Sequence, residues 1–323
     1  MWRAADVADA AEWTHVLTPS ERTEICGAVA HVTAARSSRA TLTREDFPLP
    51  ELGARIDAWA ATLHDGRGFV LLRGFPVDEL TADAVELAYL GLGLHLGTPV
   101  SQDAQGTLLG HVRDRGRPRT GPEVRLYATA ERQDFHTDGA DIIGLLCLQN
   151  AMRGGESRIV SAAAVYNEIL ARDPRRLDVL YEPMCWDRNG EESPGEDPYF
   201  RMPVIHDGNG TPSIFYIGWY IRDAQRHPQV PRLTRDQLAA MDLIESIAND
   251  PAFHVEMDFR PGDVQLLNNA VILHAREDYD DYPEPARKRH LLRLWLRAHE
   301  FASVDATLRT GIPKRADTAD ARP

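Results

Sequence analysis

The order of the apolar segments restricts the fold of this chain more than any other feature. Apolar residues at helical spacing come first, at residues 51–64 and, after an N-cap candidate at Thr81, at 82–96. Beyond Phe135, apolar runs typical of buried strands take over; they lie at residues 142–148, 264–274 and 291–296. Helices followed by strands, with no regular alternation of the two, favour a β-sandwich or jelly roll flanked by helices.

Three further segments complete the expected organisation. Residues 69–72 form a short strand candidate, and a helix with capping-box spacing begins after Thr234. Residues 101–124 and 187–213 are rich in Gly, Pro and charged residues, which predicts long loops. Loops of this length in a compact domain are usually functional. Residues 101–124 and 187–225 are the expected walls of a substrate pocket.

Composition excludes several classes of protein. The 323 residues include 36 Lys and Arg against 49 Asp and Glu, a formal net charge of −13, which disfavours general binding to nucleic acid or to anionic membranes. Three cysteines without a CxxC pair predict neither a disulfide framework nor a zinc–thiolate site. No secretion signal or membrane span is evident, so we expect a cytoplasmic protein that acts on a small molecule. The oligomeric state cannot be predicted.

The segment Phe135–Gly139 carries the central chemical signal. If it is a strand, His136 and Asp138 point to the same side, because residues two apart share a face. An imidazole and a carboxylate are two-thirds of the facial triad of non-haem Fe(II) oxygenases. His274, at the end of a strand-like run, is the candidate for the third ligand.

A second signal lies in the basic strand candidate at residues 287–297. Arg289, Arg293 and Arg297 would share one face with apolar residues between them. Buried arginines need anions, and the planar guanidinium suits bidentate binding of a carboxylate. The competing interpretation is an edge strand whose basic face lies in water.

Together these segments resemble the taurine dioxygenase/TfdA-like family of Fe(II)- and 2-oxoglutarate-dependent oxygenases. The resemblance spans roughly residues 50–300, and the motifs occur in the order typical of the family. The matching segments are GFVLLRGFP at 68–76, FHTDGAD at 135–141, RGGES at 153–157, PGDVQLLNNAVILHAR at 261–276 and RKRHLLRLWLR at 287–297.

The resemblance implies a mainly β fold with flanking helices around a double-stranded β-helix, or jelly-roll, core. The corresponding domain organisation has an N-terminal helical extension at residues 1–50 and an oxygenase domain at 51–300. Loop and helix insertions are expected at about 183–250, and residues 301–323 are expected to form a C-terminal tail.

The resemblance also implies roles for individual residues. His136, Asp138 and His274 would bind Fe(II), and Arg289 would pair with the C5 carboxylate of the cosubstrate 2-oxoglutarate. Ser157 stands where the family often has threonine and keeps the hydroxyl that hydrogen-bonds this carboxylate. With O2, such a site oxidises a C–H bond and releases succinate and CO2.

The substrate is less constrained. Arg293 corresponds to a position that in some members contacts an anionic group of the substrate and in others lies near the C1 carboxylate of 2-oxoglutarate. A basic residue there favours a sulfonate, a carboxylate or an amino-acid-like substrate. The remaining candidates for substrate contacts are Gln102, His111, Tyr127, Tyr220 and Arg222. Because Asp138 supplies a carboxylate that related halogenases lack, we expect hydroxylation, desaturation or cyclisation.

Two other classes of protein remain open. The same two histidines and aspartate could bind zinc in a hydrolase or lyase, although the HExxH motif of many zinc hydrolases is absent. A non-catalytic binding module on the same fold is the second alternative. Within the oxygenases, a protein hydroxylase or histone-demethylase-like enzyme is a further possibility, since an acidic chain could attract basic peptides, although no peptide-recognition motif is evident.

Overall fold

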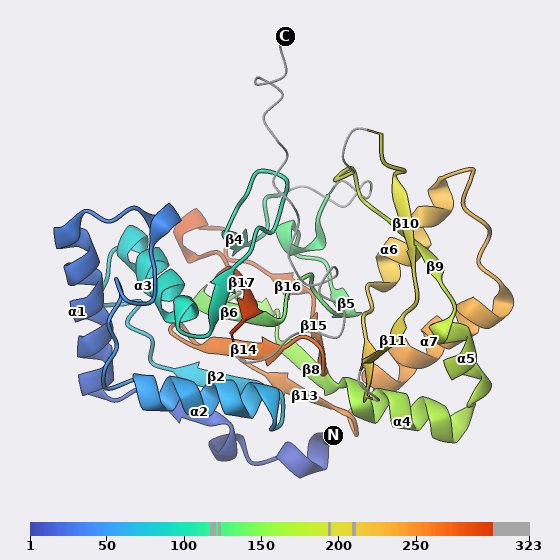
Figure 1. The fold of residues 1–323 in the computed structure, drawn as a ribbon, viewed down its shortest axis with the longest axis horizontal. Coiled ribbons are helices and arrows are strands. Elements are labelled where there is room, and N and C mark those ends of the chain that lie inside the picture. Colours follow the sequence, from blue (N-terminus) through green and yellow to red (C-terminus); the bar gives the residue numbers. More distant parts are fainter. Residues whose placement is uncertain (117–120, 122–123, 193–194, 209–210, 300–323) are drawn as a thin grey trace, which may run out of the picture.

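The computed structural model describes residues 1–116, 121, 124–192, 195–208 and 211–299. Two β-sheets face each other, and helices cover the outer face of each, so the molecule has four layers (Figure 1). The predicted tail and parts of both predicted loops lie outside the described residues. None of the helices in the described part of the chain combines the length and apolar character that a membrane crossing requires.

The larger sheet has seven strands and is antiparallel except where β1 pairs with β2. Its path runs β1 (Thr14–Val16), β2 (Phe69–Arg73), β14 (Val264–Asn268), β6 (Ile142–Gln149), β17 (His290–Ala298) and β3 (Gly97–Pro99), and β4 (Leu109–Val112) also pairs with β17. The strand candidates at 69–72, 142–148 and 291–296 are therefore confirmed. β4 is a strand within the region predicted as loop.

The smaller sheet has four antiparallel strands. Their order is β13 (His254–Met257), β8 (Ser157–Ser161), β15 (Ile272–Arg276) and β5 (Gln133–His136). Three two-stranded ribbons lie beside the sheets: β9 (Met184–Asp187) with β10 (Tyr199–Met202), β11 (Ile205–Gly208) with β12 (Thr211–Ile214), and β7 (Arg153–Gly154) with β16 (Tyr279–Asp280).

The helices form two groups. Those that cover the larger sheet are α1 (Pro19–Ala35), α2 (Gly53–His64) and α3 (Ala82–Leu94). Those beside the smaller sheet are α4 (Ala162–Arg172), α5 (Arg175–Tyr181), α6 (Gly218–Asp223) and α7 (Arg235–Ala248). Short 3-10 helices lie at Ala4–Val7, Ala10–Glu12, Arg39–Thr41, Leu126–Ala128, Ala224–Arg226 and Pro285–Arg287. The predicted N-caps Thr81 and Thr234 both accept a hydrogen bond from the first turn of their helices.

Strand alternation divides the core into layers. In β17, Leu292 and Leu294 pack against the helices, whereas Leu291 and Trp295 point between the two sheets. Arg289 and Arg293 are on the same side as Leu291 and are buried, but Arg297 is exposed. The basic face of this strand is thus turned into the protein over most of its length and is not a solvated edge.

The single strand predicted at residues 264–274 is wrong, because the chain passes from one sheet to the other in this segment. β14 ends at Asn268 and β15 starts at Ile272. Asn268 caps the turn by accepting from the Ala270 N–H, and the side chain of Asn269 turns away to bind backbone groups near Asp138. Two adjacent asparagines supply the polar contacts that an extended apolar strand could not.

Candidate metal and cosubstrate site

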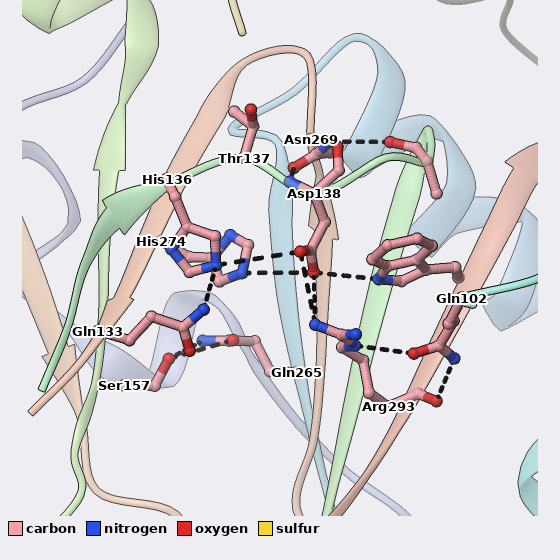
Figure 2. A network of polar contacts seen from close by, with 12 residues as sticks. Gln102, Gln133, His136, Thr137, Asp138, Ser157, Gln265, Asn269, His274 and Arg293 are labelled. Carbon is pink, nitrogen blue, oxygen red and sulfur yellow. Dashed lines mark hydrogen bonds and ion pairs between the residues drawn. The ribbon is translucent and has the colours of Figure 1, made fainter. Parts of the chain in front are cut away.

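The two candidate histidine ligands come from neighbouring strands of the smaller sheet. His136 ends β5 and lies directly opposite His274 of β15 in the antiparallel register. Both side chains point between the sheets, and their ring centroids are 4.1 Å apart (Figure 2). The register of one strand pair therefore brings together two residues that are 138 positions apart in the sequence.

Asp138 reaches the histidines through a turn, and not through strand alternation as predicted. β5 ends at His136, and Thr137 donates its N–H to the Tyr216 carbonyl. The Asp138 N–H donates to Asn269 Oδ1 at 2.9 Å, and Asn269 Nδ2 donates to the Asp138 and Ala140 carbonyls. These contacts fix the backbone so that the carboxylate faces both imidazoles (Figure 2).

The three side chains form a buried cluster that could hold a metal ion. One ligand atom from each of His136, Asp138 and His274 lies within 4.8 Å of the others. The Asp138 oxygens are 4.0 Å from His136 Nε2 and 3.8 Å from His274 Nε2. Each residue is at most 7% exposed. Two imidazoles and one carboxylate, held together and away from water, match the facial-triad ligand set.

The surroundings of the histidines keep them neutral, as a metal ligand must be. His136 Nδ1 donates to the Asp134 carbonyl at 2.8 Å, which leaves the Nε2 lone pair pointing into the cluster. That lone pair accepts from the Gln133 amide at 3.0 Å. Burial lowers the pKa of His136, and burial together with the neighbouring His136 lowers the pKa of His274 to about 3.

Asp138 is the anion of the cluster. Arg293 Nη1 lies 3.3 Å from Asp138 Oδ2, and the Trp295 Nε1–H donates to the same oxygen at 3.0 Å. Burial raises the pKa of Asp138, but the positive charge of Arg293, with smaller effects from His274 and His136, more than offsets burial and lowers it overall. The carboxylate is therefore ionised and available as a ligand at neutral pH.

A cavity extends from the cluster to Arg289. His274 and His136 line one end, and Ser157 and Arg289 line the other. The Arg289 guanidinium is buried, with Nη2 donating to the Gly155 carbonyl at 3.1 Å and Nη1 without any partner. A ligand with two anionic ends could therefore bind the candidate metal site with one end and pair with this buried guanidinium through the other.

A second cavity is lined by Asp138 and shares His136, Tyr127 and Arg293 with the first. Four of the predicted substrate contacts line it: Gln102, Tyr127, Tyr220 and Arg293. Gln102 also fixes Arg293, because its Oε1 accepts from Arg293 Nε at 2.8 Å while its Nε2 donates to the Arg293 carbonyl. The Arg293 guanidinium lies over the Tyr127 and Trp295 rings, with its Cζ 4.9 and 4.7 Å from their centroids.

The structure places the two other predicted substrate contacts elsewhere. His111 Nδ1 lies 2.9 Å from His290 Nε2, and its other nitrogen faces Glu86. Arg222 lies on α6, where it pairs with Asp242 and Glu245 of α7. Neither residue is among those that line the second cavity.

Several residues that line these cavities escaped the sequence-based prediction. Trp219 packs edge-on against His136 with centroids 4.9 Å apart, and Gln133 contacts the same imidazole. Arg125 pairs with Glu191 and donates to the Tyr220 hydroxyl, so three separate segments meet over the cavity. Gln133 could have been found by its place three residues before His136, but nothing in the sequence singles out Arg125.

The architecture and the buried cluster match what is expected of a non-haem iron oxygenase, and comparison with solved structures agrees on the fold. The non-heme iron oxygenase OrfP in complex with Fe and alpha-ketoglutaric acid superposes with a TM-score of 0.67 at 19% identity, covering 92% of this chain and 99% of that one. At that identity the likeness concerns the fold, which is mostly β with flanking helices.

Comparison of sequences identifies the family. The model of the taurine catabolism dioxygenase TauD, TfdA family matches residues 34–295, and the chain belongs to this family. The FR-33289 synthase of Streptomyces rubellomurinus (strain ATCC 31215) is 34% identical over 96% of this chain and 92% of its own length. A uridine-5'-phosphate dioxygenase of a Streptomyces species is 30% identical over 56% of this chain and 70% of its own. Members of the family use Fe(II), 2-oxoglutarate and O2.

Proposed function

We propose that this protein is an Fe(II)- and 2-oxoglutarate-dependent dioxygenase that oxidises a C–H bond of a small anionic molecule. One observation carries the proposal: the buried cluster of His136, Asp138 and His274 shares a cavity wall with an unpaired buried arginine, Arg289. Family membership supports it.

The residues present fit a bound Fe(II). His274 turns Nε2 towards Asp138 Oδ2 at 3.8 Å, His136 presents the lone pair of its Nε2, and Asp138 is ionised. These three residues would hold the metal, and Asn269 would keep Asp138 oriented. When bound, Fe(II) with 2-oxoglutarate and O2 supplies the oxidising chemistry and yields succinate and CO2.

Arg289 and Ser157 would position the cosubstrate. The guanidinium is held in place by the Gly155 carbonyl and by the Tyr279 ring, whose centroid is 5.0 Å from its Cζ. The Ser157 hydroxyl, now paired with Gln265, lies in the same cavity. Because both groups are already ordered, little conformational entropy is lost when the distal carboxylate binds.

Arg293 is the proposed recognition group for an anion on the second side of the cluster. It would contact either the substrate or the C1 carboxylate of 2-oxoglutarate, and Tyr127, Tyr220 and Gln102 would form the surrounding wall. The relative that acts on uridine-5'-phosphate supports an anionic substrate and adds phosphate esters to the sulfonates, carboxylates and amino acids to be tested. Hydroxylation, desaturation and cyclisation all fit this site.

The proposal includes the architecture. The two facing sheets would be the two halves of a double-stranded β-helix, with the site between them. Residues 51–300 would form the oxygenase domain with insertions at about 183–250, residues 1–50 an N-terminal extension and residues 301–323 a tail.

Anaerobic spectroscopy tests the proposed function. Fe(II) and then 2-oxoglutarate are added to the metal-free protein, and visible absorption is recorded. We expect a weak charge-transfer band in the green only when both are present, and no band in the Asp138→Ala variant, which lacks the only carboxylate ligand. In wild type, the band justifies a screen for substrate-dependent succinate release.

Two results would contradict the proposal. Tight zinc binding without a band would favour a hydrolase or lyase that uses the same three residues. Coupled oxidation by Asp138→Ala at the wild-type rate would show that the metal ligands are wrongly assigned.

A further inference from the structure

Arg276 is a second buried arginine in the cavity that runs from the metal cluster to Arg289. It ends β15, two residues after His274, so both side chains are on the face that looks between the sheets. Arg276 lines this cavity together with His274, Ser157 and Arg289. Only 6% of the residue is exposed.

The Arg276 guanidinium is mostly unpaired. Nη2 donates to the Glu131 carbonyl, but Nε and Nη1 are buried and have no hydrogen-bond partner. Within the described residues no carboxylate lies at ion-pair distance from it, and the acidic groups that act on it, Asp114 and Asp278, do so only from further away. Arg293, which is nearly as buried, has a carboxylate partner.

Arg276 and Arg289 behave as a pair. The Cζ atoms of both lie 5.0 Å from the centroid of the same Tyr279 ring. Two like charges in a low-dielectric cavity destabilise the empty protein, and a bound anion removes this cost.

We propose that Arg276 and Arg289 together form a two-guanidinium clamp for the distal carboxylate of the cosubstrate, and that Arg276 sets the preference for a 2-oxo acid with an anionic far end. This inference rests on the proposed function. Arg289 would approach the carboxylate from the position just before β17 of the larger sheet, and Arg276 from the end of β15 in the smaller one, so both sides of the cavity would contact one ligand group.

A structural role for Arg276 predicts a different behaviour. If its contact with the Glu131 carbonyl only anchored the segment before β5, its loss would displace His136 and weaken every ligand of the site. A clamp predicts a loss confined to ligands that carry the distal charge. It also predicts that the ligand-free protein gains stability when this charge is removed, because the repulsion from Arg289 disappears.

The experiment compares two ligands of equal chain length, 2-oxoglutarate and 2-oxopentanoate, which lacks the C5 carboxylate. Their dissociation constants are measured by calorimetry on the full chain loaded with Mn(II), in wild type and in Arg276→Gln. Arg276→Lys keeps the charge. Arg158→Gln is the matched control. Arg158 is on β8, the strand next to β15, and pairs with Glu256 and Glu277 outside the cavity.

We expect Arg276→Gln to weaken 2-oxoglutarate at least tenfold, to leave 2-oxopentanoate within twofold of wild type, and to leave the melting temperature of the ligand-free protein equal or higher. Arg276→Lys should recover part of the lost affinity, and Arg158→Gln should change neither constant. Equal weakening of both acids, or no change in either, would overturn the clamp. Failure of wild type itself to bind 2-oxoglutarate would instead refute the proposed function.

Discussion

Replacing Arg293 with Gln should have opposite effects on metal affinity at high and at low pH. In the metal-free protein the Arg293 guanidinium is the partner of the Asp138 carboxylate, and a metal ion must compete with it. The same positive charge keeps Asp138 ionised. Its removal therefore frees the carboxylate for a metal at alkaline pH, but lets a proton compete with the metal as the pH falls.

The magnitude follows from the geometry. Arg293 Nη1 and Asp138 Oδ2 are 3.3 Å apart, and each side chain is 9% exposed. At an effective dielectric constant of ~20, two unit charges at this distance attract by about 5 kcal/mol. Even about a quarter of that energy corresponds to almost a tenfold change in a dissociation constant. We expect the variant to bind Mn(II) roughly tenfold more tightly than wild type at alkaline pH.

Calorimetric titration with Mn(II), without cosubstrate, from alkaline to mildly acidic pH measures both effects. Burial raises the pKa of Asp138, and the charge of Arg293 lowers it. Without Arg293 the carboxylate takes up a proton at a higher pH, so the tighter Mn(II) binding of the variant should disappear as the pH falls. Trp295→Phe is the control, since it removes a neutral donor to the same oxygen and changes no charge. Its Mn(II) affinity should stay within about threefold of wild type.

The reasoning would be refuted if Arg293→Gln bound Mn(II) more weakly than wild type at alkaline pH. That result would mean that Arg293 orients Asp138 for the metal and does not compete with it. An identical change in Trp295→Phe would show that the lost hydrogen bond, and not the lost charge, is responsible.

Three further predictions concern the cosubstrate and stability. Arg289→Gln should raise the KM for 2-oxoglutarate in a succinate-release assay by roughly 100- to 5,000-fold, because breaking a buried charge pair costs ~3–5 kcal/mol; an unchanged KM would contradict the assignment. Burial and the nearby His111 lower the pKa of His290 to about 4. The unfolded chain takes up that proton near its ordinary pKa of about 6.5, so wild type should lose stability between these values as the pH falls, and urea midpoints of His290→Gln should fall less. Arg73→Leu should lower the free energy of unfolding by ~3–5 kcal/mol in urea melts, because the buried Asp263 carboxylate loses both hydrogen bonds that the Arg73 guanidinium donates to it. A change below about 1 kcal/mol would contradict this.

Much of the fold could be predicted because local signals and tertiary structure agree. The helix after Thr81 has an N-cap and buried apolar residues, and the strand at 142–148 is buried on both faces. The alternation predicted along residues 289–297 correctly placed Arg289, just before β17, and Arg293, within it, among the buried residues. In each case the apolar residues recur at the spacing of the element, every two residues in a strand and every 3.6 in a helix, and the same residues are buried in the structure.

The predictions that failed depend on contacts between distant segments. The break at Asn269 looks like continued strand because apolar residues flank it, and only its contacts with Asp138 and Ala140 show why the chain turns. Asp138 is close to His136 for the same reason, although the spacing suggested strand alternation. Arg276 escaped notice because the sequence cannot show whether an arginine beside a histidine has an acidic partner.

The division of the site between two sheets bears on how such an enzyme can diversify. The histidines come from β5 and β15 of the smaller sheet, whereas Arg293 lies in β17 of the larger one and Arg289 directly precedes that strand. Under the proposed function, mutations along β17 and in the segments around Arg125 and Tyr220 would therefore alter which anion is recognised without moving the histidines. A lineage built on this plan can acquire new substrates while its redox chemistry stays the same.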